Sequence, residues 1–299
     1  MLLIKLRVMT MLLVIIILII YQSYKITEQF TDVNKNNKKK IIVCLFGVIP
    51  RSIKYTWNSI NKNIVQPLKT NYDVDIYVFN LNVEDTKVDG VKLNQKDVDI
   101  IPYDYKEEEI QSSYDKNIIK ICNKIDCKIQ KYNPNTVKNS IRQMYSEYRV
   151  GKFLEKNKNK YEGAVICGPD YYILNKININ DFKESVKSKD SIFLTQVNNG
   201  GYDGYTNGIY FGNINNLNKM LFRYEELSRY IPNPKDYEYI LKNACDNKNL
   251  KVQISDIIFF KIRANKRAIL QTKPQHIHLI KNYDKVKNKL DKLNKILNT

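Results

Sequence analysis

The sequence predicts an α/β fold with a mixed, mainly parallel, Rossmann-like sheet flanked by helices, in a single domain behind one transmembrane helix. Short apolar runs typical of buried strands alternate with stretches in which apolar residues recur every three or four positions. An uncharged apolar segment near the N-terminus predicts the transmembrane helix. We expect an anchor over residues 1–24, a polar basic stem over 25–40, the domain over 41–282 and an amphipathic Lys-rich helix over 283–299.

The anchor is predicted from residues 8–21, which read VMTMLLVIIILIIY and carry no charge. Counted from Leu2, the segment offers about 20 positions for a bilayer core of about 30 Å, provided that Lys5 and Arg7 extend toward the headgroups. No small-residue cleavage site follows, which favours a single-pass anchor over a cleaved signal peptide. The Lys-rich stem, the lack of N-x-Ser/Thr sequons and the odd number of Cys favour a cytoplasmic domain. A Golgi or endoplasmic reticulum lumen stays the alternative.

The domain opens with a β-α-β pattern. Residues 41–46 (IIVCLF) are apolar without alternation, as in a strand covered on both faces of a parallel sheet. A loop with Gly47 and Arg51 follows, then apolar residues at helical spacing over 53–68 and a second strand over 73–79. Open α/β sheets bind ligands beyond the carboxyl ends of their strands, so this loop is the first candidate for a site.

The later segments continue the alternation of strands and helices. Residues 81–135 are weakly patterned, with Ile100 and Ile101 in one possible strand. Helical periodicity predicts helices over 137–154, 217–227 and 237–244. Apolar runs predict strands over 163–167, 192–197, 208–212 and 257–263.

The net charge of +18 raises the question of nucleic acid. Only eight of the 49 basic residues are Arg, whereas nucleic-acid binders favour the planar Arg fork over Lys. No basic motif with interleaved aromatic residues is present. We therefore expect no nucleic-acid partner.

The most informative acid is Asp170, three residues after the predicted strand over 163–167. A carboxylate at a strand end can hold Mg²⁺ or Mn²⁺ against a diphosphate, because these cations prefer oxygen ligands. The alternative is a turn residue that caps local amides. His276 and His278, the only histidines, share one side of an extended segment and could complete the metal site, or lie on the surface as ordinary side chains.

Two Arg residues and one loop complete the candidates. Arg51 and Arg142 could each clamp a phosphate with a bidentate fork, or form ordinary ion pairs. The Gly-rich loop NNGGYDG over 198–204 could close over a sugar with Asp203 as base, or be a plain turn. The sequence contains no GxSxG, Walker A, HExxH or GxGxxG motif, which disfavours the hydrolase, P-loop, zincin and dinucleotide-binding classes.

Four segments, in order, resemble a family of glycosyltransferase-like proteins. KKIIVCLFGVIPRSIKYTWNSINKNI followed by DVDIYVF is similar to the family's first strand, its loop with Gly and Arg, a long helix and a second strand. IRQMYSEYRVGKFLEKNKNKYEGAVICGPDYYI is similar to a block with Arg-Gln-x-Tyr-Ser and Arg-Pro-Asp. GGYDGYTNGIYFGNINNLNKM and IIFFKIRANKRAI are similar to the Gly-rich block and to the closing R-x-R strand. Membrane-anchored, Lys- and Asn-rich members are typical of large DNA viruses and some bacteria.

The resemblance implies a GT-A fold and transfer of a sugar from a nucleotide-sugar to a glycan or protein acceptor. It implies a nucleotide and donor site made by Phe46, Gly47, Arg51, Arg142, Tyr145 and Arg263. It implies that Asp170 is the ligand of Mn²⁺ or Mg²⁺. It implies that Asp203 and Asn207 lie near the donor sugar or the acceptor. If the reaction is inverting, Asp203 is the expected base, and if it is retaining, no separate protein base is required.

Three positions depart from the family pattern. Gly168 replaces the Arg of Arg-Pro-Asp, Tyr172 occupies the place of a second Asp, and Lys261 replaces one Arg of the closing strand. The first departure removes a positive charge near the diphosphate, and the second removes a metal ligand. A catalytically inactive, anchored binding or interaction protein with this fold is therefore the alternative function.

Overall fold

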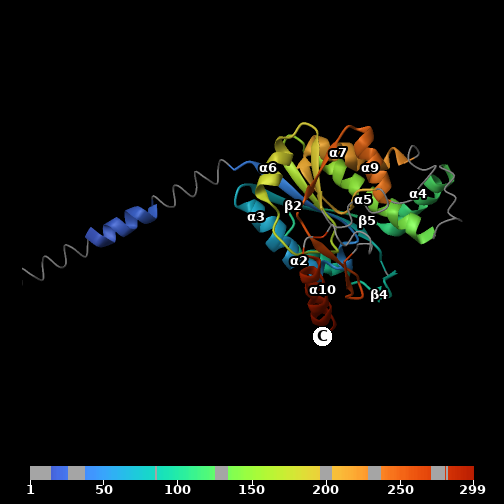
Figure 1. Ribbon diagram of the computed structural model, residues 1–299, viewed down its shortest axis with the longest axis horizontal. Helices are drawn as coiled ribbons and strands as arrows, with labels where there is room; N and C mark the ends of the chain where they lie inside the picture. Colours follow the sequence, from blue (N-terminus) through green and yellow to red (C-terminus); the bar gives the residue numbers. More distant parts are fainter. Residues whose placement is uncertain are drawn as a thin grey trace, which may run out of the picture. The chain divides into compact units, whose positions relative to one another are not determined.

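The computed structural model describes residues 15–25, 38–84, 86–124, 134–195, 204–227, 237–270, 280 and 282–299 (Figure 1). Contacts divide the chain into two units, residues 1–39 and 40–299. In the first unit residues 15–25 are helical, and the side chains of Ile15 to Ile20 are exposed. Among the described residues no helix is long and apolar enough to cross a membrane. Because residues 8–14 of the predicted anchor lie outside the described residues, the anchor stays a prediction.

The second unit is built on a seven-stranded sheet with the strand order β10-β8-β9-β6-β1-β2-β5. Neighbouring strands run parallel except at β9, which is antiparallel to both β6 and β8. The predicted mixed, mainly parallel sheet is therefore confirmed. The strands are β1 (Lys40–Gly47), β2 (Asp73–Asn82), β5 (Tyr105–Ile110), β6 (Gly163–Cys167), β8 (Ser191–Thr195), β9 (Ile209–Asn213) and β10 (Lys251–Ser255).

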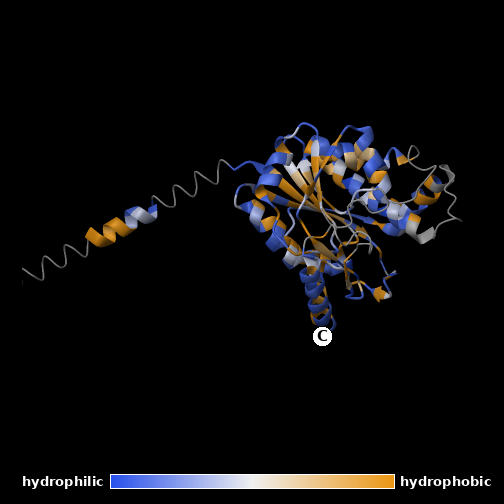
Figure 2. Ribbon diagram, in the orientation of Figure 1, coloured by the Kyte–Doolittle hydropathy of each residue, from blue (hydrophilic) through white to orange (hydrophobic). Residues whose placement is uncertain are grey.

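Helices cover both faces of the sheet, and its apolar residues lie between them (Figures 1 and 2). One core joins the sheet to α2, α3 and α6, and the other joins it to α4, α5, α7 and α9. This double cover explains why the central strands read as unbroken apolar runs. The helices are α2 (Ile53–Ile60), α3 (Gln66–Lys69), α4 (Gln111–Lys124), α5 (Pro134–Lys156), α6 (Ile179–Lys187), α7 (Ile214–Leu221) and α9 (Tyr237–Asn247).

The predicted helix over 53–68 contains a π-helical turn at Asn61–Val65, between α2 and α3. Pro67 has no backbone N–H and so leaves the carbonyl of Asn63, four residues earlier, without its helical partner. That carbonyl instead accepts a hydrogen bond from the Ile177 N–H at 2.8 Å, and the Asn63 amide donates to the Ile173 carbonyl at 2.8 Å. The irregular turn therefore ties this helix to the chain that follows β6.

A second, antiparallel sheet has the order β12-β11-β7. It consists of β7 (Tyr171–Ile173), β11 (Phe259–Ile262) and β12 (Ala268–Ile269). The C-terminal helix α10 (Tyr283–Asn298) packs Val286 and Leu293 into the core of this sheet, and Asn294 hydrogen-bonds both backbone groups of Ala268. The predicted strand over 257–263 therefore exists, but it belongs to this smaller sheet.

The predicted strand at Ile100 and Ile101 is wrong. Gln95–Ile100 is a 3-10 helix that begins after Asn94, whose side chain accepts from the Lys96 N–H. The third strand along this edge is β5, which reads YKEEEI and alternates between half-buried and exposed residues. An edge strand so rich in Glu lacks the apolar run that predicted the central strands.

Candidate functional site

The candidate site lies at the carboxyl ends of β1 and β6. Strand β1 ends at Gly47, whose φ of +105° is strained for any residue with a Cβ. The loop that follows is fixed by the buried Asn80 at the end of β2, whose side-chain oxygen accepts from the Ile49 N–H at 3.1 Å. Phe46 is buried in the core, so its side chain packs under the loop.

Three elements fix the turn that carries Asp170. The Pro169 carbonyl accepts from the Thr56 hydroxyl of α2 at 2.6 Å, and the Asp170 carbonyl accepts from the Ile262 N–H of β11 at 2.7 Å. The Gly168 N–H donates to the Gly208 carbonyl at 2.9 Å. The Asp170 side chain is 9% exposed, so it is held in a tight and largely dry position.

The space around position 168 fits only a glycine. The Tyr171 ring lies against both Gly168 and Gly208, and a Cβ on either glycine would come within 2.4 or 1.9 Å of that side chain. The Tyr171 hydroxyl donates to the Asn207 carbonyl at 3.3 Å. Because the Tyr171 ring fills this space, an Arg at position 168 would not fit. The hydrogen bond to Tyr171 also places Asn207 beside the Asp170 turn.

Arg51 lies between two carboxylates. Its Nη1 is 4.0 Å from an Asp170 oxygen, and its Nε and Nη2 bind Asp89 at 3.0 to 3.3 Å. Asp89 and Gly90 form the two-residue turn between β3 (Lys87–Val88) and β4 (Val91–Lys92). Both residues have positive φ, as a type I′ hairpin turn requires.

Asp89 is also bound from a second direction. Its side chain also accepts from the Ala264 N–H at 3.1 Å, which joins the hairpin to the end of β11. Burial alone would raise the pKa of Asp89, but the charge and hydrogen bonds of Arg51 and the charge of Arg263 outweigh burial and lower it. The carboxylate therefore stays charged and holds the plane of the Arg51 guanidinium.

Lys261 of β11 adds a third positive charge to those of Arg51 and Arg263. Its ammonium lies 5.5 Å from the centre of the Tyr171 ring. Burial lowers the pKa of Lys261, the Asp170 charge opposes that shift, and Arg263 and Arg51 add to it. No acidic group of the described residues lies within ion-pair distance of Lys261. Three cations, Arg51, Arg263 and Lys261, therefore gather around Asp170 and Asp89, with Glu238 also within electrostatic reach of Lys261. Because no acid among the described residues forms an ion pair with Lys261, its ammonium is suited to bind an anion.

Two predicted donor-site residues lie among other partners. Arg142 binds Asp115 of α4 with two nitrogens and Asn139 at 2.9 Å. Tyr145 stacks on Tyr114 at 3.8 Å between ring centres and donates to Glu109 of β5 at 2.6 Å. The structure thus engages Arg142 and Tyr145 with α4 and β5 and does not pair them with Asp170.

Three predicted site residues, Asp203, His276 and His278, lie outside the described residues. Within the described part of the chain, no group of three His, Cys, Asp or Glu side chains is arranged to hold a metal ion. Among the described residues, Asp170 could therefore bind a metal ion only as a single carboxylate ligand.

Sequence reasoning missed Asp89 and Asn80 as parts of the site. An Asp-Gly pair flanked by Val88 and Val91 is a hairpin signal that could have located Asp89. Nothing local indicates that Asn80 holds the loop after β1, because that contact depends on the pairing of β1 with β2. No family model matches this chain, and no curated protein matches it.

Proposed function

We propose that the chain is a membrane-anchored GT-A glycosyltransferase that moves a sugar from a nucleotide-sugar to a glycan or protein acceptor. The observation that carries this proposal is the cluster of basic side chains, Arg51, Lys261 and Arg263, around Asp170 at the carboxyl ends of β1 and β6. The leaving group of such a reaction is a nucleoside diphosphate, whose growing negative charge is the main electrostatic cost of the step. The mixed sheet and its first β-α-β unit are compatible with the family resemblance.

Each basic side chain has a distinct task in this proposal. Arg51, oriented by Asp89, offers its remaining N–H groups to one phosphate as a planar fork. Lys261, which lacks an acidic partner among the described residues, contributes a compact charge to the diphosphate. Arg263 adds charge at the same end of β11.

Asp170 is the proposed ligand of Mn²⁺ or Mg²⁺. A single carboxylate fits Mg²⁺, which commonly binds one or two carboxylates together with substrate phosphates. When bound, the ion would act as a Lewis acid that neutralises charge on the diphosphate. Asn207, beside the same turn, would contact the donor sugar or the acceptor, and Asp203 stays the proposed base.

A non-catalytic nucleotide-sugar-binding protein is the second candidate. The observation that favours it is Tyr172 in the place of a second Asp, which leaves Asp170 as the one carboxylate on this turn. Such a protein would bind the donor and release no nucleoside diphosphate.

The deciding experiment incubates the purified full chain with a panel of nucleotide-sugars in Mn²⁺ or in EDTA. Binding is measured by calorimetry and turnover by release of nucleoside diphosphate. We expect at least one donor to bind and to be consumed. Binding without release would select the second candidate, and failure of every donor to bind would refute both.

A matched pair of variants tests the assignment of Lys261. Lys261→Met should weaken nucleoside diphosphate binding about 10- to 100-fold, as expected for loss of one charged contact. Lys266→Met, in the exposed turn after β11, should change it less than about threefold. Equal effects of the two variants would remove Lys261 from the site.

A further inference from the structure

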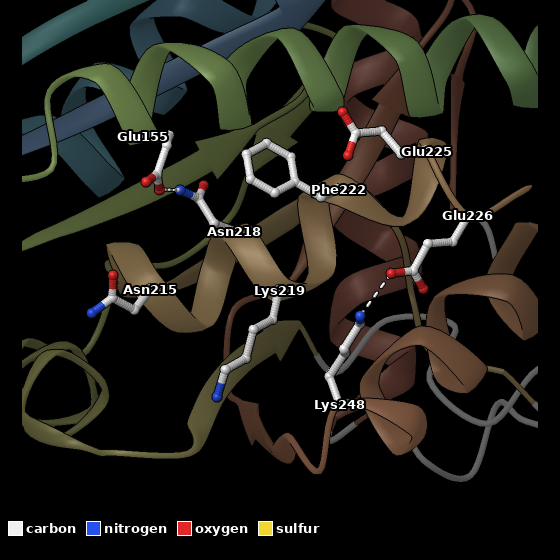
Figure 3. A pocket seen from close by; sticks show the side chains of 8 residues that line it. All are labelled: Glu155, Asn215, Asn218, Lys219, Phe222, Glu225, Glu226 and Lys248. Atoms are coloured by element: carbon white, nitrogen blue, oxygen red, sulfur yellow. Dashed lines mark hydrogen bonds and ion pairs between the residues drawn. The ribbon is translucent and has the colours of Figure 1, made fainter.

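A hollow of about 320 Å³ lies away from the Asp170 turn, on the outer side of the α5–α7 layer (Figure 3). Its lining comes from α5, α7, the 3-10 turn Phe222–Tyr224 and the end of α9. The volume is at the small end of the range for ligand pockets, about 300–1,000 Å³. The hollow thus has room for the end of a ligand and shares no residue with the site described above.

One buried polar atom in this lining lacks a partner. Asn218 is 5% exposed, and its amide nitrogen donates to Glu155 at 3.0 Å. Its side-chain oxygen has no hydrogen-bond donor among the described residues. Figure 3 shows that oxygen on the side of Phe222. A buried amide oxygen without a donor costs free energy, and a ligand hydroxyl that reaches this oxygen through a small shift of the Asn218 side chain would remove that cost.

The charges around the hollow are nearly balanced. Glu226 binds Lys248 at 2.6 Å, and Glu155 binds Lys158 at 2.8 Å. Glu225 is the third acid of the lining, and Lys219 has no acidic partner within 4.0 Å in the described part of the chain. Mixed carboxylates, amides and an ammonium group offer both donors and acceptors without a strong net field. Such a lining suits a neutral ligand that donates and accepts hydrogen bonds at several positions.

An aromatic ring completes the hollow. Phe222 is half-buried and packs its edge against Tyr148, with 5.8 Å between ring centres. Gly151 makes this position possible, because a Cβ there would approach the Phe222 ring to 2.9 Å. The Lys152 ammonium lies 5.9 Å from the centre of the ring, and the rest of this half-buried ring offers apolar surface beside the polar groups. The C–H face of a sugar ring packs on an aromatic face, while its hydroxyls reach the surrounding polar side chains.

We infer that this hollow is a saccharide-binding site, which takes a neutral mono- or disaccharide unit with one ring face on Phe222 and a hydroxyl on Asn218. The inference does not depend on the proposed catalytic function. If the chain is a transferase, the site would hold an acceptor glycan at a distance from the reacting sugar. If it is a non-catalytic protein, the same site would still retain glycans.

The test adds a panel of methyl glycosides to the full chain, in a detergent without a sugar headgroup. Binding of each glycoside is measured by saturation-transfer NMR. We expect at least one glycoside to bind, and excess nucleoside diphosphate should not displace it. Phe222→Leu keeps an apolar side chain and should weaken binding about 3- to 10-fold. Lys219→Ala, an exposed position on α7, should weaken it about 2- to 5-fold. Lys187→Ala, an exposed Lys on α6, is the matched control and should leave binding unchanged.

Several results would overturn the inference. They are the failure of every glycoside to bind, binding that neither Phe222→Leu nor Lys219→Ala weakens, and displacement of the glycoside by nucleoside diphosphate. Capture of a Lys-rich peptide with no glycoside binding would assign the hollow to a basic peptide. Because Lys219 is exposed, its variant keeps the test valid even if Phe222→Leu proves unstable.

Discussion

The sharpest stability prediction concerns a fully buried ion pair beside the core that joins the sheet to α4, α5, α7 and α9. The Arg223 guanidinium, after α7, donates to Glu147 of α5, and both side chains are 0% exposed. The hydroxyl of Tyr237 in α9 also donates to Glu147, and that of Tyr210 in β9 does so at 3.3 Å. Burial alone would lower the pKa of Arg223, but Glu147 and the two tyrosines raise it. This network therefore joins four elements through one carboxylate.

Glu147→Gln removes the charge and keeps the shape of the side chain. It leaves the Arg223 guanidinium charged and buried with no acid beside it in the described structure, and breaking a buried pair from one side costs about 3–5 kcal/mol. For a unit of this size, about 2–4 °C per kcal/mol predicts a fall in Tm of about 6–20 °C. The double variant Glu147→Gln, Arg223→Met removes both charges, so it should recover much of the loss.

The assay is urea unfolding of the full chain followed by fluorescence of Trp57, the single tryptophan, which is buried against the first core. Glu155→Gln is the matched control on the same helix. Its side chain is 42% exposed and pairs with Lys158 on the surface, so the expected change is below about 1 kcal/mol. A loss for Glu147→Gln no larger than that of Glu155→Gln would refute the reasoning, and so would a double variant less stable than either single one.

Three further predictions follow from other parts of the chain. Burial alone would raise the pKa of Asp75, but hydrogen bonds from Tyr161, Lys40 and Lys160 outweigh burial and lower the pKa below its ordinary value of 3.8. The stability that Asp75 adds over Asp75→Asn, about 2 kcal/mol, should be complete at neutral pH and decline as pH falls below 3.8 in urea titrations; a constant difference would contradict this. Gly208→Ala should cost about 3 kcal/mol or more, because φ is +117° and the Tyr171 hydroxyl blocks the Cβ, whereas Gly90→Ala, in open space at φ +80°, should cost about 1–2 kcal/mol; equal costs would count against the steric account. The full chain should stay with membranes through an alkaline wash, and Ile15→Lys with Ile19→Lys should release it, because each charge opposes insertion by about 3 kcal/mol; retention of the double variant would argue against the predicted anchor.

The central strands could be predicted because both of their faces are covered. Residues 41–46 and 163–167 lie between two helical layers, so neither strand needs polar residues on alternate positions. Strand β5 could not be predicted in this way. Its Glu107 and Glu109 pair with Arg149 of α5, and that pairing exists only after the helix has packed across the sheet.

The candidate site was predictable only where strand ends determine it. Arg51 and Asp170 follow β1 and β6, and parallel neighbouring strands bring their carboxyl ends together. Arg142 shares a helix with residues that cover the sheet, but its partner Asp115 lies on α4, in a stretch where the sequence pattern is weak. The position of Arg142 on a predicted helix therefore does not indicate which acidic side chain it pairs with.

Gly168 shows how a comparison at one position can mislead. The resemblance noted in the sequence places an Arg there, next to Asp170. In the structure the Tyr171 ring occupies the space that any side chain at 168 would need. The same ring has the Lys261 ammonium over it, within the electrostatic reach of Asp170. The positive charge near Asp170 therefore comes from β11 and not from position 168, and the charge balance at the Asp170 turn depends on two strands about 90 residues apart in the chain.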